Sequence, residues 1–149
     1  MIANGTPVIA RKLFGSRFGF PLDGGVKFMD GRPLLGSSKT LRGLLLAVVA
    51  ATLTAPLFGY CWGIGAMIGG AAMLGDLLSS FIKRRLGLAP SSMALGLDQI
   101  PESLLPLLVC KVPLGLGWLS IAMVTMAFFV CELLFSFVLY RLHIRRRPY

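Results

Sequence analysis

Four apolar runs constrain the fold of this chain more than any other feature of its sequence. They cover about residues 41–58, 63–86, 100–113 and 118–139. A run of about 20 apolar residues is long enough for a helix to cross the hydrocarbon core of a bilayer. Only 14% of the residues are charged, whereas soluble domains carry about 25%. The pattern therefore predicts an all-α integral membrane protein that forms a single membrane domain over residues 1–149, with four transmembrane helices.

The basic residues predict the orientation of these helices. Of the 15 Lys and Arg residues, 14 lie in residues 1–42, 83–85 and 141–147, and only Lys111 lies elsewhere. Four spans return these three segments to one side of the membrane, which the positive-inside rule assigns to the cytoplasm. We therefore expect a multi-pass protein of the cell inner membrane. Its polar region over residues 1–40, a large cytoplasmic or re-entrant loop, and its basic tail over 140–149 then face the cytoplasm.

The net charge of +9 bears on the binding partners. A strongly basic soluble domain would suggest nucleic acid as a partner. In this chain, however, the cations flank apolar segments and are not interleaved with aromatic residues. The charge distribution therefore indicates anionic membrane lipids and argues against nucleic acid.

The second apolar run carries a carboxylate near its cytoplasmic end. A charge within a membrane span indicates function by default. Two interpretations remain open: a functional polar face, or an ion pair within the helix beside basic side chains that extend to the lipid headgroups. Five polar residues of this run share one face of a helix, because they lie at offsets of 0, 3, 4, 7 and 8 from the carboxylate. They are Asp76, Ser79, Ser80, Lys83 and Arg84.

Small residues also recur every four positions in and just before the second run. Such a stripe allows helices to approach closely in lipid. We interpret it as a packing surface rather than as a catalytic signal. Its members are Gly59, Gly63, Ala71, Gly75 and Ser79, with Met67 interrupting the pattern.

Two further polar clusters precede the first and third runs. The stretch "GSSKTLRG" (36–43) supplies Lys39, Thr40 and Arg42. It resembles the end of a P-loop but lacks the required glycines, so we reject that interpretation. The stretch "LDQIPE" (97–102) supplies Asp98 and Glu102. These acids either share a divalent cation or serve as a helix N-cap and a first-turn glutamate.

Together the three clusters place cations, glycines and carboxylates on one side of the membrane. This combination suits a phosphate-rich substrate with Mg²⁺, because phosphoryl and nucleotidyl transfer require mainly positioning and charge neutralisation. The only histidine is His143, in the basic tail. A Ser–His–acid hydrolase is therefore excluded.

Five short motifs occur in a characteristic order along the chain. They are "ANGTP" (3–7), "PLDGG" (21–25), "DGRPLLGSSKTLRG" (30–43), "GDLLSSFIKRR" (75–85) and "LDQ" (97–99). In these motifs the sequence resembles the CDP-archaeol synthase family, which is related to the CDP-diacylglycerol synthases. The resemblance implies an enzyme of phospholipid biosynthesis that transfers CMP from CTP to a lipid phosphate, with Mg²⁺, and releases pyrophosphate.

The resemblance and the polar clusters together suggest roles for individual residues. We expect Asp76, Asp98 and Lys83 to be catalytic, and Asp76, Asp98 and Glu102 to bind Mg²⁺. The expected partners are CTP, a lipid phosphate acceptor and membrane lipids, and a homodimer is also considered. The alternative is a non-catalytic small membrane transporter or assembly subunit that binds anionic lipid. The expected substrate-binding residues are Asn4, Asp23, Asp30, Lys39, Thr40, Arg42, Ser80 and Arg84.

Two departures from the family pattern affect these expectations. The family usually has a further membrane helix before its "AN" motif, whereas this sequence starts at Met1, so either the start is truncated or misassigned or that helix is missing. The family also tends to carry a second aspartate three residues after the first in its "DQ" motif, where this chain has Pro101 followed by Glu102. Either Glu102 replaces that aspartate or the metal site is altered. The acceptor, an archaeal ether lipid or a diacyl phosphatidic acid, stays open.

Overall fold

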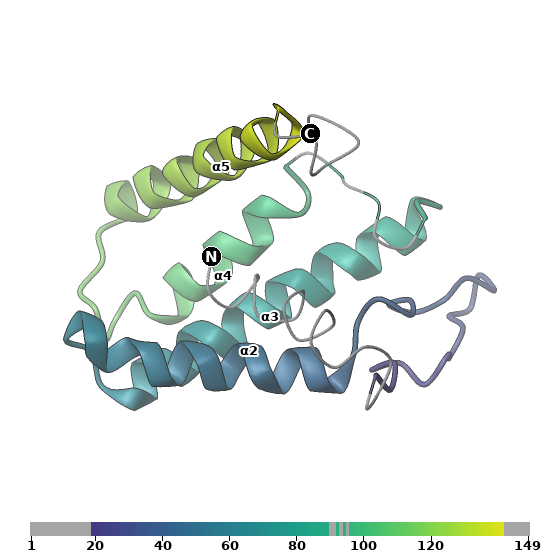
Figure 1. Ribbon diagram of the computed structural model, residues 1–149, viewed down its shortest axis with the longest axis horizontal. Coiled ribbons are helices and arrows are strands. Elements are labelled where there is room, and N and C mark those ends of the chain that lie inside the picture. Colours follow the sequence, from purple (N-terminus) through teal and green to yellow (C-terminus); the bar gives the residue numbers. More distant parts are fainter. Residues whose placement is uncertain (1–18, 90–91, 93, 95, 142–149) are drawn as a thin grey trace.

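The computed structural model describes residues 19–89, 92, 94 and 96–141, and the described chain is built from helices. Helix α3 packs against both α2 and α4, and α5 packs against α4. Successive helices run in opposite directions, so the start of α2 and the ends of α3 and α5 lie at the same end of the bundle (Figure 1). The predicted all-α fold is confirmed for these residues. The helices are α2 (Leu41–Thr54), the 3-10 turn η1 (Ala55–Phe58), α3 (Trp62–Arg85), α4 (Gln99–Val109) and α5 (Trp118–Arg141).

In the part of the chain that the structure describes, three helical segments are long and apolar enough to cross a membrane. They are Leu41–Phe58, Trp62–Arg85 and Trp118–Val138. These segments agree with the first, second and fourth predicted runs to within one residue at each end. The chain is therefore a membrane protein whose main spans are readable from its apolar runs.

The third predicted run, 100–113, forms a shorter helix than expected. Helix α4 contains 11 residues, and at 1.5 Å per residue it is about 16 Å long, roughly half the thickness of the hydrocarbon core. The chain leaves the helix after Val109 and turns over residues 110–115. By length alone, α4 is not a complete transmembrane helix.

Helices α2 and α3 approach closely because small residues face each other. A Cβ atom added at Gly65 would lie 2.7 Å from the carbonyl oxygen of Ala51, and one added at Gly69 would lie 2.9 Å from the Ala51 Cβ. The predicted packing through small residues is thus confirmed in kind. Of the expected stripe, Ala71, Gly75 and Ser79 are buried, whereas Gly59 and Gly63 are exposed.

Helix α3 meets α4 at Gly75. A Cβ atom added there would overlap the backbone of Pro101 and would lie 2.8 Å from the Cα of Glu102. Only glycine allows this approach. The turn of α3 that carries Asp76 therefore lies directly against the first turn of α4.

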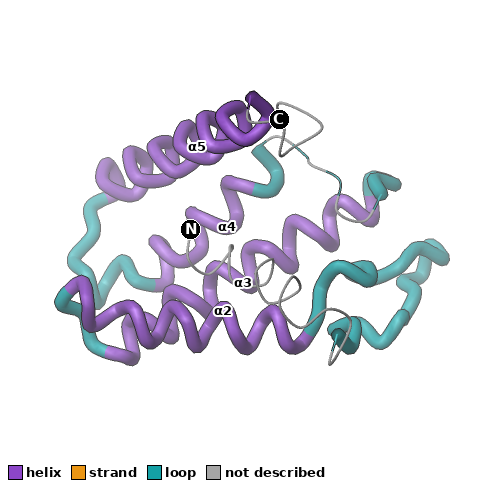
Figure 2. Tube along the Cα trace, viewed as in Figure 1, coloured by secondary structure: helices purple, strands orange, loops and turns teal. Residues whose placement is uncertain are grey.

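Residues 19–40, which we call the N-terminal loop, form a folded polar segment at the end of the bundle where α2 begins (Figure 2). Two isolated antiparallel bridges, Pro21 with Thr40 and Lys27 with Pro33, fold the loop back on itself. Thr40 then caps α2, because its Oγ1 accepts a hydrogen bond of 3.2 Å from the backbone N–H of Gly43. The loop thus delivers its last residues directly to the start of the first span.

Candidate active site

An ion pair joins the N-terminal loop to α3 at the centre of the predicted site. Lys39 Nζ lies 2.5 Å from both carboxylate oxygens of Asp76. The two side chains are 21% and 29% exposed, so each keeps part of its surface available to a ligand. Ser38 and Thr40 border a small cavity of about 60 Å³ beside the pair. Lys39 and Asp76 were both expected in the site, but their pairing was not predicted.

A second ion pair joins α3 to the start of α4. Lys83 Nζ lies 2.7 Å from Asp98 Oδ1 and donates a hydrogen bond of 2.9 Å to the carbonyl oxygen of Ser92. The other carboxylate oxygen of Asp98 accepts from the backbone N–H of Ala94 at 3.1 Å. Asp98 occupies the N-cap position of α4, yet its side chain makes no capping hydrogen bond. The N-cap interpretation of Asp98 is therefore wrong, and its carboxylate instead closes the loop before α4.

The rest of the predicted polar face of α3 points into the protein. Ser79, Ser80 and Lys83 are buried, and Arg84 is only 4% exposed. Arg84 Nη2 donates a hydrogen bond of 2.9 Å to the carbonyl oxygen of Ala89. The interpretation that Lys83 and Arg84 extend to the headgroups is therefore wrong. Their expected contact with substrate phosphates would require these internal bonds to open.

Asp23 organises the N-terminal loop from within. Its carboxylate accepts hydrogen bonds from the backbone N–H groups of Gly25, Leu35 and Gly36 at 3.1, 3.0 and 2.9 Å. Burial raises the pKa of Asp23, but these three donors outweigh burial and hold the pKa below its usual range. Asp23 was expected to bind substrate. In the structure its oxygens bind the loop, so any effect on a ligand passes through the loop's shape.

The remaining expected substrate-binding residues are divided between the site and its edge. Asp30 pairs with Arg85, whose Nη1 lies 2.5 Å from Asp30 Oδ1. Arg42 is half-buried in the first turn of α2. Asn4 lies outside the described residues. Sequence reasoning missed Arg85, although its place at the end of the basic run 83–85 was a usable signal.

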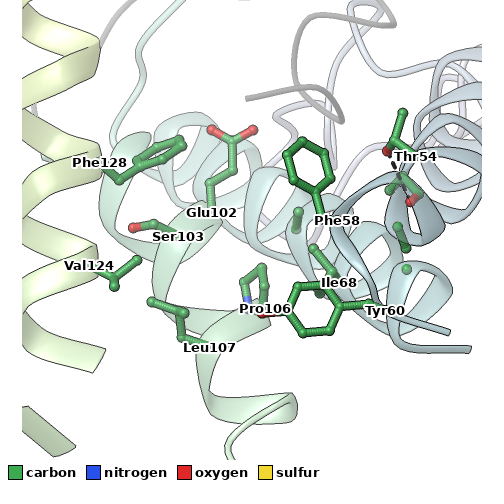
Figure 3. Close-up of a pocket in the computed structure, with 14 residues that line it drawn as sticks. Thr54, Phe58, Tyr60, Ile68, Glu102, Ser103, Pro106, Leu107, Val124 and Phe128 are labelled. Atoms are coloured by element: carbon green, nitrogen blue, oxygen red, sulfur yellow. Dashed lines mark hydrogen bonds between the residues drawn. The ribbon is translucent and has the colours of Figure 1, made fainter. Parts of the chain in front are cut away.

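Glu102 borders an apolar cavity of about 400 Å³, which residues of η1 and of all four helices line (Figure 3). In this view its carboxylate lies between Phe58 and Phe128, at the opposite end of the cavity from Leu107. The lining is otherwise almost entirely apolar. The cavity was not predicted, because its walls come from four segments that are distant in the sequence.

The carboxylates also allow a test of the expected Mg²⁺ site. Within residues 19–89, 92, 94 and 96–141, no three His, Cys, Asp or Glu side chains form a ready-made metal centre. Mg²⁺ commonly keeps several waters and is held by one or two carboxylates together with substrate phosphates. The partly exposed carboxylate of Asp76, beside a lysine, has this character. One carboxylate of this kind fits an ion that is shared with a nucleotide, and the expected second carboxylate, Asp98 or Glu102, stays a prediction.

Comparison with known proteins covers the whole chain. Residues 2–64 and 60–149 match the family described as CarS-like, CDP-archaeol synthase. The CDP-archaeol synthase of Sulfurisphaera tokodaii is 39% identical over 158 aligned positions, which cover 100% of this chain and 90% of that protein. The CDP-archaeol synthase of Hyperthermus butylicus is 44% identical over 108 positions, which cover 67% of this chain and 60% of that protein.

A solved structure resembles the fold as well. It is described as an intramembrane enzyme for archaeal membrane lipids biosynthesis, and it superposes with a TM-score of 0.75 at 35% sequence identity. The match covers 89% of this chain and 85% of the other. The similarity therefore extends over the helices as well as over the short polar motifs.

Proposed function

The chain belongs to the CDP-archaeol synthase family, and from this we propose that it transfers CMP from CTP to the phosphate of a lipid acceptor and releases pyrophosphate. It is a membrane cytidylyltransferase of lipid biosynthesis. The alternative of a non-catalytic transporter or assembly subunit is set aside, because the family and the similar solved structure are enzymes.

The observation that carries the proposal is the pair between Lys39 and Asp76. It joins the two longest motifs of the chain, "DGRPLLGSSKTLRG" and "GDLLSSFIKRR", although its members are 37 positions apart. A lysine whose ammonium group is positioned by a partly exposed carboxylate can bind phosphate oxygens. These two residues are therefore the ones on which we place the reaction.

In the proposed reaction an oxygen of the lipid phosphate attacks the α-phosphorus of CTP. The bond between the α-phosphorus and its bridging oxygen to the β-phosphorus breaks, and pyrophosphate leaves with the electron pair. Such a transfer needs aligned reactants and compensation of the phosphate charge. Lys39 supplies a cation to the triphosphate, and Asp76 holds that cation in place. Mg²⁺, when bound at Asp76 with Asp98 or Glu102, supplies further charge neutralisation.

We place the site on the cytoplasmic side of the cell membrane, with the chain crossing the membrane at α2, α3, α4 and α5. The alternating helix directions in Figure 1 and the basic residues at the end where α3 stops support this topology. Helix α4 alone is too short to cross the hydrocarbon core, so in this topology the turn that follows it would complete the third crossing. CTP would approach from the N-terminal loop, and the acceptor would approach from the bilayer.

The apolar cavity supports a lipid as the acceptor. Its lining includes Val124 and Phe128 of α5 and Leu107 of α4, and Glu102 is its charged residue. A hydrocarbon chain in this volume would leave its headgroup near the first turn of α4. Because Gly75 packs against that turn, Asp76 is close by. The cavity and the proposed reaction centre therefore adjoin each other.

The test uses the purified protein in nanodiscs with Mg²⁺ and CTP labelled at the α-phosphate. Two acceptors are compared, an unsaturated archaeal ether-lipid phosphate and a diacyl phosphatidic acid. We expect labelled CDP-lipid and an equal amount of pyrophosphate with at least one acceptor. Asp76→Asn should abolish both products, whereas Lys27→Ala, an exposed cation on the same loop, should retain them.

Size-exclusion profiles of the variants provide the folding control. Failure to form CDP-lipid with either acceptor would overturn the proposed reaction. Full activity in folded Asp76→Asn would remove Asp76 from the reaction centre. Production of pyrophosphate without CDP-lipid would indicate hydrolysis of CTP rather than transfer.

A further inference from the structure

Arg32 and Arg85 hold each other's backbone across the end of α3. Arg32 Nη1 donates a hydrogen bond of 2.6 Å to the carbonyl oxygen of Arg85, the last residue of α3. In return, Arg85 Nη2 donates a hydrogen bond of 3.4 Å to the carbonyl oxygen of Arg32 and a shorter one of 2.6 Å to that of Pro33. The first contact satisfies a carbonyl that a helix end leaves unpaired, and it places a cation at the negative end of the helix dipole.

The same guanidinium of Arg85 makes three further contacts. Its Nη1 pairs with Asp30 at 2.5 Å. Its Cζ lies 4.7 Å from the ring centre of Phe28 and 5.1 Å from that of Phe81, within the range of cation–π attraction. The two rings meet edge to face at 5.5 Å. One side chain of α3 therefore contacts a loop carboxylate, loop carbonyls and a loop aromatic ring.

The surrounding backbone accommodates this arrangement. Gly87 follows α3 with a positive φ of 74°, and a Cβ atom there would lie 3.3 Å from Arg32 Nη1. Asp30 accepts the backbone N–H of Arg32 at 3.0 Å, which closes the turn that presents Arg32. The contacts of Arg32 and Arg85 with each other's backbone, together with the Asp30 pair, form a unit that we call the arginine clamp.

Among the residues that the structure describes, the arginine clamp is the second polar attachment of the N-terminal loop to α3. The first is the pair of Lys39 with Asp76. Asp76 and Arg85 are nine positions apart on the helix, or about 13 Å along its axis. Two attachments at this separation fix both the position and the direction of the loop, whereas the Lys39 pair alone would leave the loop free to pivot.

We propose that Arg85, together with Arg32, is a positioning residue that holds the N-terminal loop in register on α3 and thereby keeps Lys39 against Asp76. The proposal rests on the proposed function, because Lys39 and Asp76 are the residues assigned to the triphosphate. Arg85 acts through the loop and does not touch the reacting atoms.

The arginine clamp is partly exposed, so its loss should change the position of the loop more than the stability of the whole fold. The Asp30 side chain is 38% exposed and that of Arg85 is 20% exposed, and ion pairs at such sites contribute little to global stability. The packing of α2, α3 and α4 does not depend on these contacts. Loss of the clamp should therefore affect CTP binding much more than the unfolding of the helical bundle.

The first test is a double-mutant cycle on the dissociation constant for CTP, measured by calorimetry with Mg²⁺. Binding is used because it can be measured in variants with little turnover. Arg85→Ala should raise the constant about tenfold in the otherwise unaltered chain and less than twofold in Lys39→Met. Arg85→Lys, which keeps the charge but not the planar fork, should lie between Arg85→Ala and the parent. Lys27→Ala should match the parent. Equal effects of Arg85→Ala in both backgrounds would overturn the proposal.

The second test is hydrogen exchange at two loop amides in nanodiscs, without CTP. The N–H of Leu34 bonds to the carbonyl of Val26, and that of Phe28 bonds to the carbonyl of Arg32. Both amides should exchange faster in Arg85→Ala, with unchanged exchange in α2. Unchanged loop exchange would overturn the clamp even if CTP binding fell. Faster loop exchange in a chain that makes no CDP-lipid would support the clamp and overturn the proposed reaction, so the two failures are distinguishable.

Discussion

Gly75→Ala is the substitution that tests most directly how the helices bring the site together. The added methyl group would lie 2.6 Å from the carbonyl carbon of Pro101 and 2.8 Å from the Cα of Glu102. Carbon atoms in favourable contact are about 3.5–4.0 Å apart, so α3 and α4 must separate by about 1 Å. The atoms that would have to move belong to the helix backbone, which cannot rotate away as a side chain can.

The magnitude follows from a matched comparison on the same helix. Gly70 has no atom within 4 Å of an added Cβ, so Gly70→Ala changes only helix propensity, a gain of up to about 1 kcal/mol. Gly75→Ala makes the same gain but overpacks the contact, which typically costs about 1–3 kcal/mol. The difference between the two variants cancels the propensity contribution. We expect Gly75→Ala to be about 1–3 kcal/mol less stable than Gly70→Ala.

The assay is thermal unfolding in mild detergent, followed by far-UV circular dichroism, together with CDP-lipid formation at saturating CTP. Separation of α3 from α4 moves Asp76 away from the first turn of α4, so turnover by Gly75→Ala should fall at least tenfold, while Gly70→Ala keeps the parent rate. Equal stability and equal turnover of the two variants would refute the argument that close contact at Gly75 sets the geometry of the site.

Two further predictions concern the loop and the cavity. Asp23→Asn should weaken the N-terminal loop by about 1–3 kcal/mol, because a charged acceptor of backbone hydrogen bonds is lost. Since the pKa of Asp23 is lowered on folding, the parent loop should keep its amide protection above about pH 4 and lose it as the pH falls further. Amide exchange measured over a pH series should show this loss in the parent and not in Asp23→Asn. Val124→Trp should raise the KM for the lipid acceptor without changing the KM for CTP, because Val124 lines the apolar cavity. Val130→Trp, at a similarly exposed position of α5 outside that lining, should change neither KM. Identical acceptor KM values for the two tryptophan variants would show that the cavity does not bind the acceptor.

The membrane spans could be predicted because length and apolarity are local properties of a sequence. The runs at 41–58 and 118–139 needed no tertiary information to be assigned as helices. The run at 100–113 could not be resolved in this way. Apolar residues lie on both sides of Lys111, at Cys110 and Val112, while the backbone already turns, so hydropathy alone could not locate the end of α4 at Val109.

The membership of the candidate site was easier to predict than its contacts. Helical periodicity correctly grouped Ser79, Ser80, Lys83 and Arg84 on one side of α3, and all four are buried. It also placed Asp76 on the same face as Lys83, about two turns away along the axis. The partner of Asp76 is Lys39, which the N-terminal loop supplies from 37 positions away. Periodicity along one helix contains no information on which loop folds over it.

The basic run at 83–85 both signals the orientation of the chain in the membrane and makes tertiary contacts. Consecutive residues of a helix are rotated by about 100°, so three adjacent cations must point in three directions. Lys83 turns to Asp98 before α4, Arg84 turns to the carbonyl of Ala89, and Arg85 turns to the N-terminal loop. The positive-inside rule explains only the side of the membrane on which this run lies. The run also ties α3 to the connection before α4, at two points, and to the N-terminal loop. Replacement of these residues by other cations would preserve the orientation signal and still disturb the site, which is why Arg85→Lys is a sharper probe of the clamp than loss of charge alone.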